Sequence, residues 1–226
     1  TALSKIAKTD LGIGAQQTSS ALTSAKDVEV NVFDGPCPAG NVGVQVNNIA
    51  PVNKGEVVWT VDPTAVIFFG RLFNTGKVDL RRLVAVAGSE INNPAYAEVL
   101  VGQPISSLLE GKLAKKDHVR IINGNPLTGR KCTAEDFVGG HTSEITVIPE
   151  GDNVDEMLGW ILPRTNDFSV SRSYLSWLFG KNKEYSLDAR VKGGERHMIM
   201  SGEYDKVLPM DIYGEYLVKA IIAGDI

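Results

Sequence analysis

Cysteine and histidine are scarce in this sequence, and their scarcity excludes most metal sites. The 226 residues include two cysteines, Cys37 and Cys132, and three histidines, and none of them forms a Cys-x-x-Cys or His-x-x-x-His pair. Iron–sulfur clusters and structural zinc sites normally need four closely spaced ligands. Disulfide-stabilised domains likewise carry many more cysteines. We therefore expect no metal ligands, and two reduced thiols, with that of Cys37 partly buried.

Long apolar runs and clusters of positive charge are also missing. A membrane-spanning helix needs ~18 consecutive apolar residues, whereas the longest apolar stretches here, Ala65–Phe69 and Leu83–Ala87, have the length of one buried element. The formal net charge is -4, and lysine and arginine occur singly or in pairs. A nucleic-acid-binding surface would need a basic stripe. We expect no direct membrane span and no nucleic-acid partner.

Complete catalytic motifs are absent as well. No G-x-S-x-G elbow is present, and a lone cysteine with three dispersed histidines is what chance supplies. The acidic cluster Asp152, Asp155 and Glu156 lies in a polar stretch without calcium-loop spacing, which is typical of solvated surface. We expect no self-contained catalytic site.

The first part of the chain shows the alternation typical of an α/β fold. Residues 2–7 place apolar side chains on one helical face, and Leu11–Gly14 has the pattern of a short buried strand. The polar segment Gln16–Ala25 is compatible with a helix, and Val28–Val32 alternates with period two. Helix, strand, helix, strand predicts a partial Rossmann-like domain with a parallel sheet.

The loop after the second predicted strand is the candidate binding site. It lies beyond the carboxyl end of a strand, where open α/β sheets bind ligands. Its glycines permit close backbone approach, and a helix expected over Val42–Ile49 would offer its first amides to an anion. The candidate cofactor-binding residues are Gly35, Pro36, Pro38, Ala39 and Gly40. The prolines remove two donors, however, and the string matches neither G-x-G-x-x-G nor a Walker loop, so a rigid structural turn is the alternative.

A longer helix follows with clear start and stop signals. Asp62 is suited to be its N-cap, and Pro63 to be its first residue. Gly76 is suited to the left-handed conformation that ends many helices. Between these residues apolar side chains recur on one face of the predicted helix.

The pattern changes after residue 80 to closely spaced strands around one helix. We predict strands over Leu83–Ala87, Glu98–Val101 and Val119–Asn123, with a short helix over Gln103–Leu109. Parallel crossovers need a dozen or more residues each, so this spacing does not suit a doubly wound fold. It predicts a β-grasp domain, a small mixed sheet over a single helix. A further strand is expected over Glu144–Pro149.

The last part contains two predicted helices separated by charged and glycine-containing segments. Ser171–Gly180 is expected to turn Tyr174, Leu175 and Leu178 inward, and Tyr213–Ala223 to be amphipathic. The expected organisation is therefore a Rossmann-like α/β domain over residues 1–80, a β-grasp domain over 81–150, and a strand and loop region over 151–226 that enters a helical C-terminal region.

Several characteristic strings follow one another along the chain, among them Val32–Gly43, Gly70–Gly76, Val84–Pro94, Arg120–Gly129, Glu156–Trp160, Asp167–Leu175 and Tyr204–Asp211. Taken together and in this order, they closely resemble one family, the NqrA subunits of the bacterial sodium-translocating NADH:quinone oxidoreductase. The match runs from about Val28 to Gly224. The family is related to the C subunit of the Rnf complex and to the flavin-carrying subunit of respiratory NADH dehydrogenase.

The resemblance implies a peripheral protein on the cytoplasmic side of the bacterial inner membrane, with a soluble-ligand-binding β-grasp (SLBB) domain. Its complex passes electrons from NADH to ubiquinone and exports sodium. The other subunits of the complex are the implied partners, with ubiquinone as a further one. The complex uses NADH, flavins and iron–sulfur centres, but we expect this chain, as part of a longer subunit, to bind none of them.

Two hypotheses about function remain open. The chain is either a docking scaffold that helps to shape a quinone site, or a module that binds a nucleotide, flavin or quinone at the Gly35–Gly40 loop.

Overall fold

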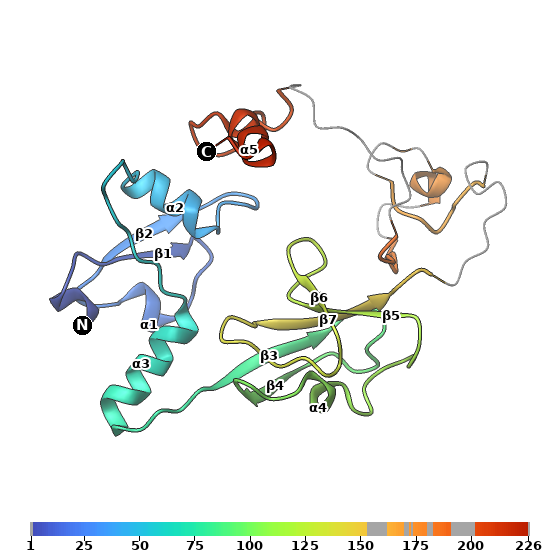
Figure 1. Ribbon diagram of the computed structural model, residues 1–226, viewed down its shortest axis with the longest axis horizontal. Helices are drawn as coiled ribbons and strands as arrows, with labels where there is room; N and C mark the ends of the chain where they lie inside the picture. Colours follow the sequence, from blue (N-terminus) through green and yellow to red (C-terminus); the bar gives the residue numbers. More distant parts are fainter. Residues whose placement is uncertain are drawn as a thin grey trace. The chain divides into compact units, whose positions relative to one another are not determined.

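The computed structural model describes residues 2–152, 162–169, 172, 174–179, 183–190 and 202–225 (Figure 1). They belong to two compact units, one formed by Thr1–Val61 with Glu195–Ile226 and the other by Asp62–Gly194. Among the described helices, none is both long and apolar enough to span a bilayer.

The first unit contains a parallel pair of strands and its connecting helices. Strands β1 (Asp10–Gly14) and β2 (Glu29–Phe33) run parallel, in a register that pairs Leu11 with Val30 and Ile13 with Val32. Helix α1 (Ser20–Thr23) crosses between them, and α2 (Val42–Ile49) follows β2. The predicted α/β character and both strands are confirmed.

Two helices predicted in this unit are much shorter in the structure. The segment Gln16–Ala25 forms a single helical turn, α1, because its serines and threonines favour turns and caps over helix interiors. Residues 2–7 form only a three-residue 3-10 helix, Leu3–Lys5, which contains no buried residue. A single turn is too short to hold an apolar stripe against a sheet.

The second unit is a five-stranded mixed sheet with one short helix, preceded by a long helix. After α3 (Pro63–Thr75), its elements are β3 (Arg81–Ala87), β4 (Ala95–Leu100), α4 (Ile105–Leu109), β5 (Val119–Asn123), β6 (Arg130–Cys132) and β7 (Glu144–Pro149). The strand order is β4-β3-β7-β5-β6, in which β3 and β7 are parallel and the other pairs antiparallel. The predicted grasp-like sheet over one helix is confirmed, and only the three-residue β6 was not predicted.

The core of the second unit lies between one face of this sheet and α4. Alternate residues of β3, Val84 and Val86, are almost completely buried, as are Ile145 and Val147 of β7. The cluster is completed by Ile91, Val99, Ile105, Leu108, Leu109 and Val138. Burying an aliphatic side chain of this size contributes about 1.5–3 kcal/mol to folding, so this face is the main source of stability in the unit.

Gly88, directly after β3, lies very close to the backbone of β7. A Cβ atom at this position would be 2.0 Å from the carbonyl oxygen of Val147, and the φ angle of Gly88 is +119°. Side chains avoid this backbone region, and the neighbouring strand cannot move away without breaking its own ladder. Glycine is therefore required at this point by both conformation and space.

A charged cluster on β5, β6 and the end of β7 links strands of this sheet. Arg120 donates two hydrogen bonds to the Glu150 carboxylate, at 2.9 and 2.6 Å, and Lys131 adds a third at 3.1 Å. These bonds, that from Arg120 above all, hold the pKa of Glu150 at about 2, despite partial burial that acts in the opposite direction. The cluster ties the end of β7 to the β5–β6 hairpin.

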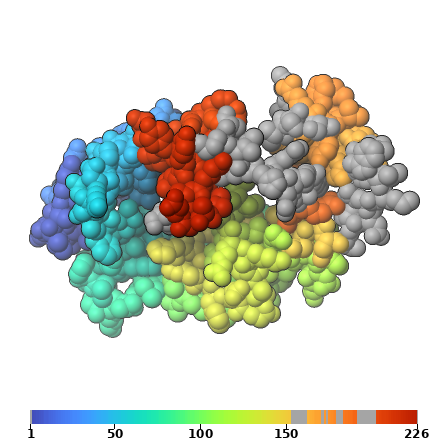
Figure 2. Space-filling view, turned by 45° about the horizontal axis from the view of Figure 1, so that its top comes forward, coloured from blue at the N-terminus to red at the C-terminus, as the bar shows by residue number. Residues whose placement is uncertain are grey.

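After β7, the second unit contains a 3-10 helix over Leu175–Phe179. Helix α5 (Gly214–Ala223) belongs to the first unit, in the part of the chain that is red in Figure 2. The prediction that Leu175 and Leu178 turn inward was wrong, because both are about half exposed. Ser176 is the buried residue, and its hydroxyl donates to the carbonyl of Asp167 at 2.6 Å. Of the acidic cluster, Asp152 hydrogen-bonds His118 at the surface, and the other two carboxylates lie outside the described residues.

We predict that Gly88→Ala destabilises the chain by on the order of 3 kcal/mol, because it adds a clash with β7 to the conformational cost. Urea unfolding of the 226-residue chain measures the change. Gly102→Ala is the matched control, since Gly102 has a φ of +91° but open space around it, and it should cost only about 1 kcal/mol. Equal losses in the two variants would contradict a role for crowding.

We predict that Glu150→Gln lowers the free energy of unfolding by about 1 kcal/mol at pH 7, a value that allows for solvent screening of this partly exposed cluster. The depressed pKa means that the wild-type advantage is complete above the ordinary glutamate range near 4.5 and is lost as the pH falls toward 2. Urea titrations at pH 7 and pH 3 should show the difference between the two proteins shrinking. Glu98→Gln, an exposed carboxylate 3.7 Å from Arg81, should change little at either pH.

Candidate functional site

The candidate loop connects the carboxyl end of β2 to the start of α2, as predicted from the sequence. Two successive turns build it, in which the Ala39 amide donates to the Pro36 carbonyl at 3.0 Å and the Asn41 amide to the Pro38 carbonyl at 2.8 Å. The peptide bond between Cys37 and Pro38 is cis. The loop is thus an ordered double turn at the position where parallel sheets offer their ligand-binding edge.

The donors available in this loop are the backbone amides at the start of α2. Asn41 is the N-cap, and its side chain makes no capping hydrogen bond. The amides of Val42 and Gly43 precede the intrahelical ladder and are suited to an anion or a polar ligand edge. Pro36 and Pro38 contribute no amide hydrogen. The free backbone amides at the N-terminus of α2 are therefore the groups at this edge of the sheet that could bind a ligand.

The loop does not fit the phosphate cradle of a dinucleotide or flavin. In such cradles the second and third glycines are required because a ligand or helix approaches the backbone closely. Here a Cβ at Gly40 or Gly43 would meet no atom within 4 Å, and only Gly35, with φ at +144°, has a backbone conformation that favours glycine. The Gly35–Gly40 assignment therefore stays a prediction without a matching cradle.

Cys37 is exposed in this loop, so the expectation that it is partly buried was wrong. The double turn leaves Cys37 at its tip, whereas the neighbouring Pro38 and Ala39 are partly buried. Cys132 is the thiol that is partly buried, and burial raises its pKa above the ordinary value. Among the described residues, no group of three His, Cys, Asp or Glu side chains is arranged to hold a metal ion.

Gln45 of α2 is a polar residue near the sheet that sequence reasoning did not single out. Its side-chain amide lies over Gly12 of β1, where a Cβ would come within 2.2 Å of the Gln45 Oε1 atom. Glycine in the middle of a predicted strand is the signal that could have indicated this close approach. Gln45 is partly buried, and its amide lies between the helix and the strand.

A polar network fastens both ends of α3 to the grasp sheet. At its start, Asp62 accepts from the Ala65 amide at 2.7 Å and contacts His141 Nδ1 at 2.9 Å. Partial burial raises the pKa of Asp62, but these two partners outweigh it, so the net pKa is below the ordinary value. The residue before His141 is held by the buried Arg82 of β3, which donates to the carbonyl of Gly140.

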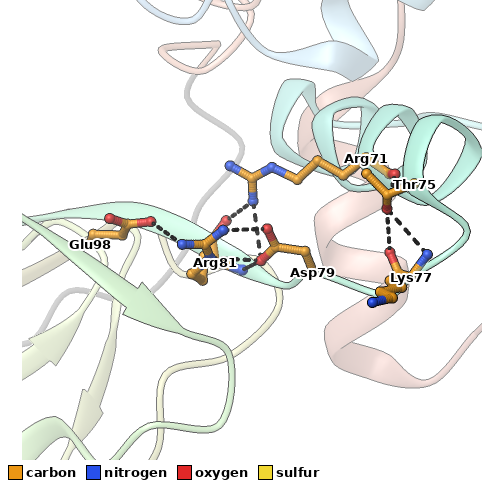
Figure 3. Close-up of polar contacts among 6 residues, drawn as sticks. All are labelled: Arg71, Thr75, Lys77, Asp79, Arg81 and Glu98. Atoms are coloured by element: carbon orange, nitrogen blue, oxygen red, sulfur yellow. Dashed lines mark hydrogen bonds and ion pairs between the residues drawn. The ribbon is translucent and has the colours of Figure 1, made fainter.

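At the other end of α3, arginines and an aspartate make the connection (Figure 3). Arg71 of α3 donates to the carbonyl of Arg81, the first residue of β3, and lies 3.7 Å from Asp79. Arg81 binds the Asp79 carboxylate with two hydrogen bonds of 3.0 and 2.8 Å and lies 3.7 Å from Glu98 of β4. These bonds from Arg81 keep the pKa of Asp79 far below its ordinary range.

Helix α3 begins and ends as predicted, but its apolar face is not buried. The Asp62 cap and the left-handed Gly76 are both observed, yet none of its residues is buried in the described structure. A shallow groove of about 210 Å³ lies between this face and the segment that leads to β3. It is lined mainly by Ala65, Phe68, Phe69, Leu72, Val78 and Leu80.

Comparison with known families gives matches along most of the chain. Residues 1–78 match the model described as the NqrA second alpha/beta domain, and residues 83–134 match the model described as the NQRA C-terminal domain. The two models describe successive parts of one protein family and together cover more than half of the chain. The chain belongs to the NqrA family.

Curated NqrA relatives are similar over nearly the whole sequence. The NqrA subunit of the Na(+)-translocating NADH-quinone reductase of Neisseria meningitidis serogroup C is 37% identical over 203 residues, which are 89% of this chain and 45% of the relative. The proteins of the same name from Vibrio atlanticus and Vibrio alginolyticus are 36% and 35% identical and are each matched over 46% of their length. The chain thus spans less than half the length of these NqrA relatives.

We predict that Asp62→Ala lowers the free energy of unfolding by about 1 kcal/mol, because it removes the cap of α3. Thermal unfolding followed by circular dichroism measures the change. His141→Ala removes only the exposed partner and should cost less than about 0.5 kcal/mol. A larger effect for His141→Ala than for Asp62→Ala would contradict the capping role.

Proposed function

We propose that this chain is part of the NqrA subunit of a sodium-translocating NADH:quinone reductase, in which it acts as a docking scaffold. The observation that carries the proposal is the pair of consecutive NqrA domain matches, together with about 36% identity to curated NqrA proteins over nine-tenths of the chain. In this role the chain lies on the cytoplasmic side of the bacterial inner membrane, its partners are the other subunits, and the redox cofactors are carried by those subunits.

The described side chains favour a scaffold over a catalyst. The polar networks bind strand and helix ends to one another: Asp62 to His141, Arg71 and Arg81 to Asp79, and Arg120 to Glu150. Each of these charged groups forms an ion pair with a neighbouring side chain, and the pairs remain accessible to solvent. None of these networks forms the nucleophile, base and orienting group that catalysis would require.

We expect deletion of the subunit to abolish NADH-driven quinone reduction in membrane vesicles, and expression of the full-length subunit to restore it. The 226-residue chain alone, purified, should show no flavin absorbance. Stoichiometric flavin on the purified chain would contradict the proposal that other subunits carry the redox cofactors. Normal quinone reduction without the subunit would contradict membership of the reductase.

The binding-module hypothesis keeps one supporting observation, which is the position of the Gly35–Gly40 loop between the carboxyl end of β2 and the first turn of α2. Isothermal titration of the chain with NADH, FMN and a short-chain quinone tests it. Heat of binding that disappears in a Gly35→Val variant would support a ligand at this loop, whereas no heat with any of the three would exclude it.

A further inference from the structure

The apolar side chains of helix α5 are exposed at the surface and are not packed against the rest of the chain. Leu217, Val218, Ile221 and Ile222 recur at i, i+1, i+4 and i+5, which places them on one helical face. All four are exposed, by 43 to 72%. Glu215, in the first turn of the helix, is only 2% exposed, and Lys219, one turn later, is partly buried. The two charged side chains of the helix are therefore more covered than the four apolar ones.

The exposed apolar surface continues from α5 into the segment before it. Tyr213 packs edge-to-face on Tyr216, with ring centroids 6.0 Å apart, and both rings remain largely exposed. Ile212 and Val207 add exposed aliphatic side chains on the approach to the helix. Contiguous apolar surface of this kind, with aromatic side chains at one end, is typical of binding surfaces.

A hollow with two carboxylates lies at the start of this surface. Its volume is about 390 Å³, and its lining combines Asp205 and Asp211 with Leu208, Met210, Ile212 and Tyr213. Residues 202–225 contain five carboxylates and two lysines, and Lys206 is already paired with Glu203. Within residues 202–225, Asp205 and Asp211 therefore give the apolar surface a negatively charged edge at the hollow.

This charge decides which kind of partner fits. An anionic lipid surface would be repelled, because peripheral helices that bind such surfaces have Lys and Arg on their polar side. A second copy of the chain would bring Asp205 and Asp211 against like charges. An apolar helix flanked by Lys or Arg is complementary in both respects, since its side chains would cover the stripe and its cations would enter the hollow.

We infer that α5, with the Asp205–Tyr213 hollow, docks an amphipathic helix with basic flanking residues in a neighbouring subunit, outside the bilayer. The inference rests on the proposed function, which supplies the neighbouring subunits. Segments on the cytoplasmic side of membrane subunits carry an excess of Lys and Arg. The apolar face of such a helix would cover the exposed side chains of α5, and its cations would enter the hollow.

The apolar part of the surface is tested in the full-length subunit within the detergent-solubilised complex. Ile222→Asp and, separately, Leu217→Asp should reduce retention of the subunit by tagged membrane subunits by about ten-fold or more, because a charge would enter a buried apolar contact. Leu127→Asp is the matched control: Leu127 is 94% exposed in the turn between β5 and β6, and its replacement should leave retention unchanged. Circular dichroism of each variant verifies folding.

The charged part is tested by reversing the hollow. Asp205→Lys combined with Asp211→Lys should weaken retention by about ten-fold, and Asp205→Asn with Asp211→Asn by less, because neutralisation removes attraction without adding repulsion. Glu110→Lys, at the end of α4, is the control for a general charge effect. Unchanged retention of the double lysine variant would overturn the assignment of a basic partner.

Other outcomes separate this inference from the proposed function. Full retention of both Ile222→Asp and Leu217→Asp, beside a retained wild type, would overturn the docking surface alone. Failure of the wild-type subunit itself to be retained would overturn the proposed function and this inference with it. Binding to vesicles of phosphatidylethanolamine and phosphatidylglycerol, or dimerisation in sedimentation, if lost in Ile222→Asp, would assign the surface to lipid or to a second copy instead.

Discussion

The parallel pairing of β3 with β7 is the constraint on which the second unit depends. It joins Ala85–Ala87 to Glu144–Thr146, segments almost sixty residues apart in the chain, and everything between them has to be accommodated on the two sides of this pair. β4 extends the sheet beyond β3, β5 and β6 extend it beyond β7, and α4 covers the shared apolar face. The close passage of Gly88 over Val147 is a consequence of the same pairing, because the chain leaves β3 directly across its neighbour.

Local signals in the sequence predicted most of this architecture. The bounds of α2, β5 and β7 agree with the predicted ranges, because each has a regular apolar period between turn residues. The ends of α3 were predictable from the cap chemistry of Asp62 and Gly76. In contrast, β6 has only three residues, too few for a period, and it exists because β5 offers it a partner.

The sequence does not predict which apolar helix faces are buried by other parts of the structure. Periodicity shows that one side of α3 or α5 is apolar, but burial depends on tertiary neighbours that a local pattern does not contain. The exposure of Cys37 has a similar origin, since its turn partly buries Pro38 and Ala39 and leaves the thiol outside. The candidate loop was correctly placed between β2 and α2, whereas the amide of Gln45 over Gly12 was missed because its signal is the absence of a side chain.

The alternation of exposed and buried side chains along β3 has a consequence for misfolding. Arg81 and Leu83 point to one side of the strand, and Arg82, Val84 and Val86 to the other, where they are buried. Sliding β3 by one residue along either neighbour would exchange these two sets, placing the exposed pair in the valine layer and stranding Arg82 away from the Gly140 carbonyl. A shifted register of β3 would therefore be much less stable than the observed one, and the sequence of this strand favours a single alignment of the sheet.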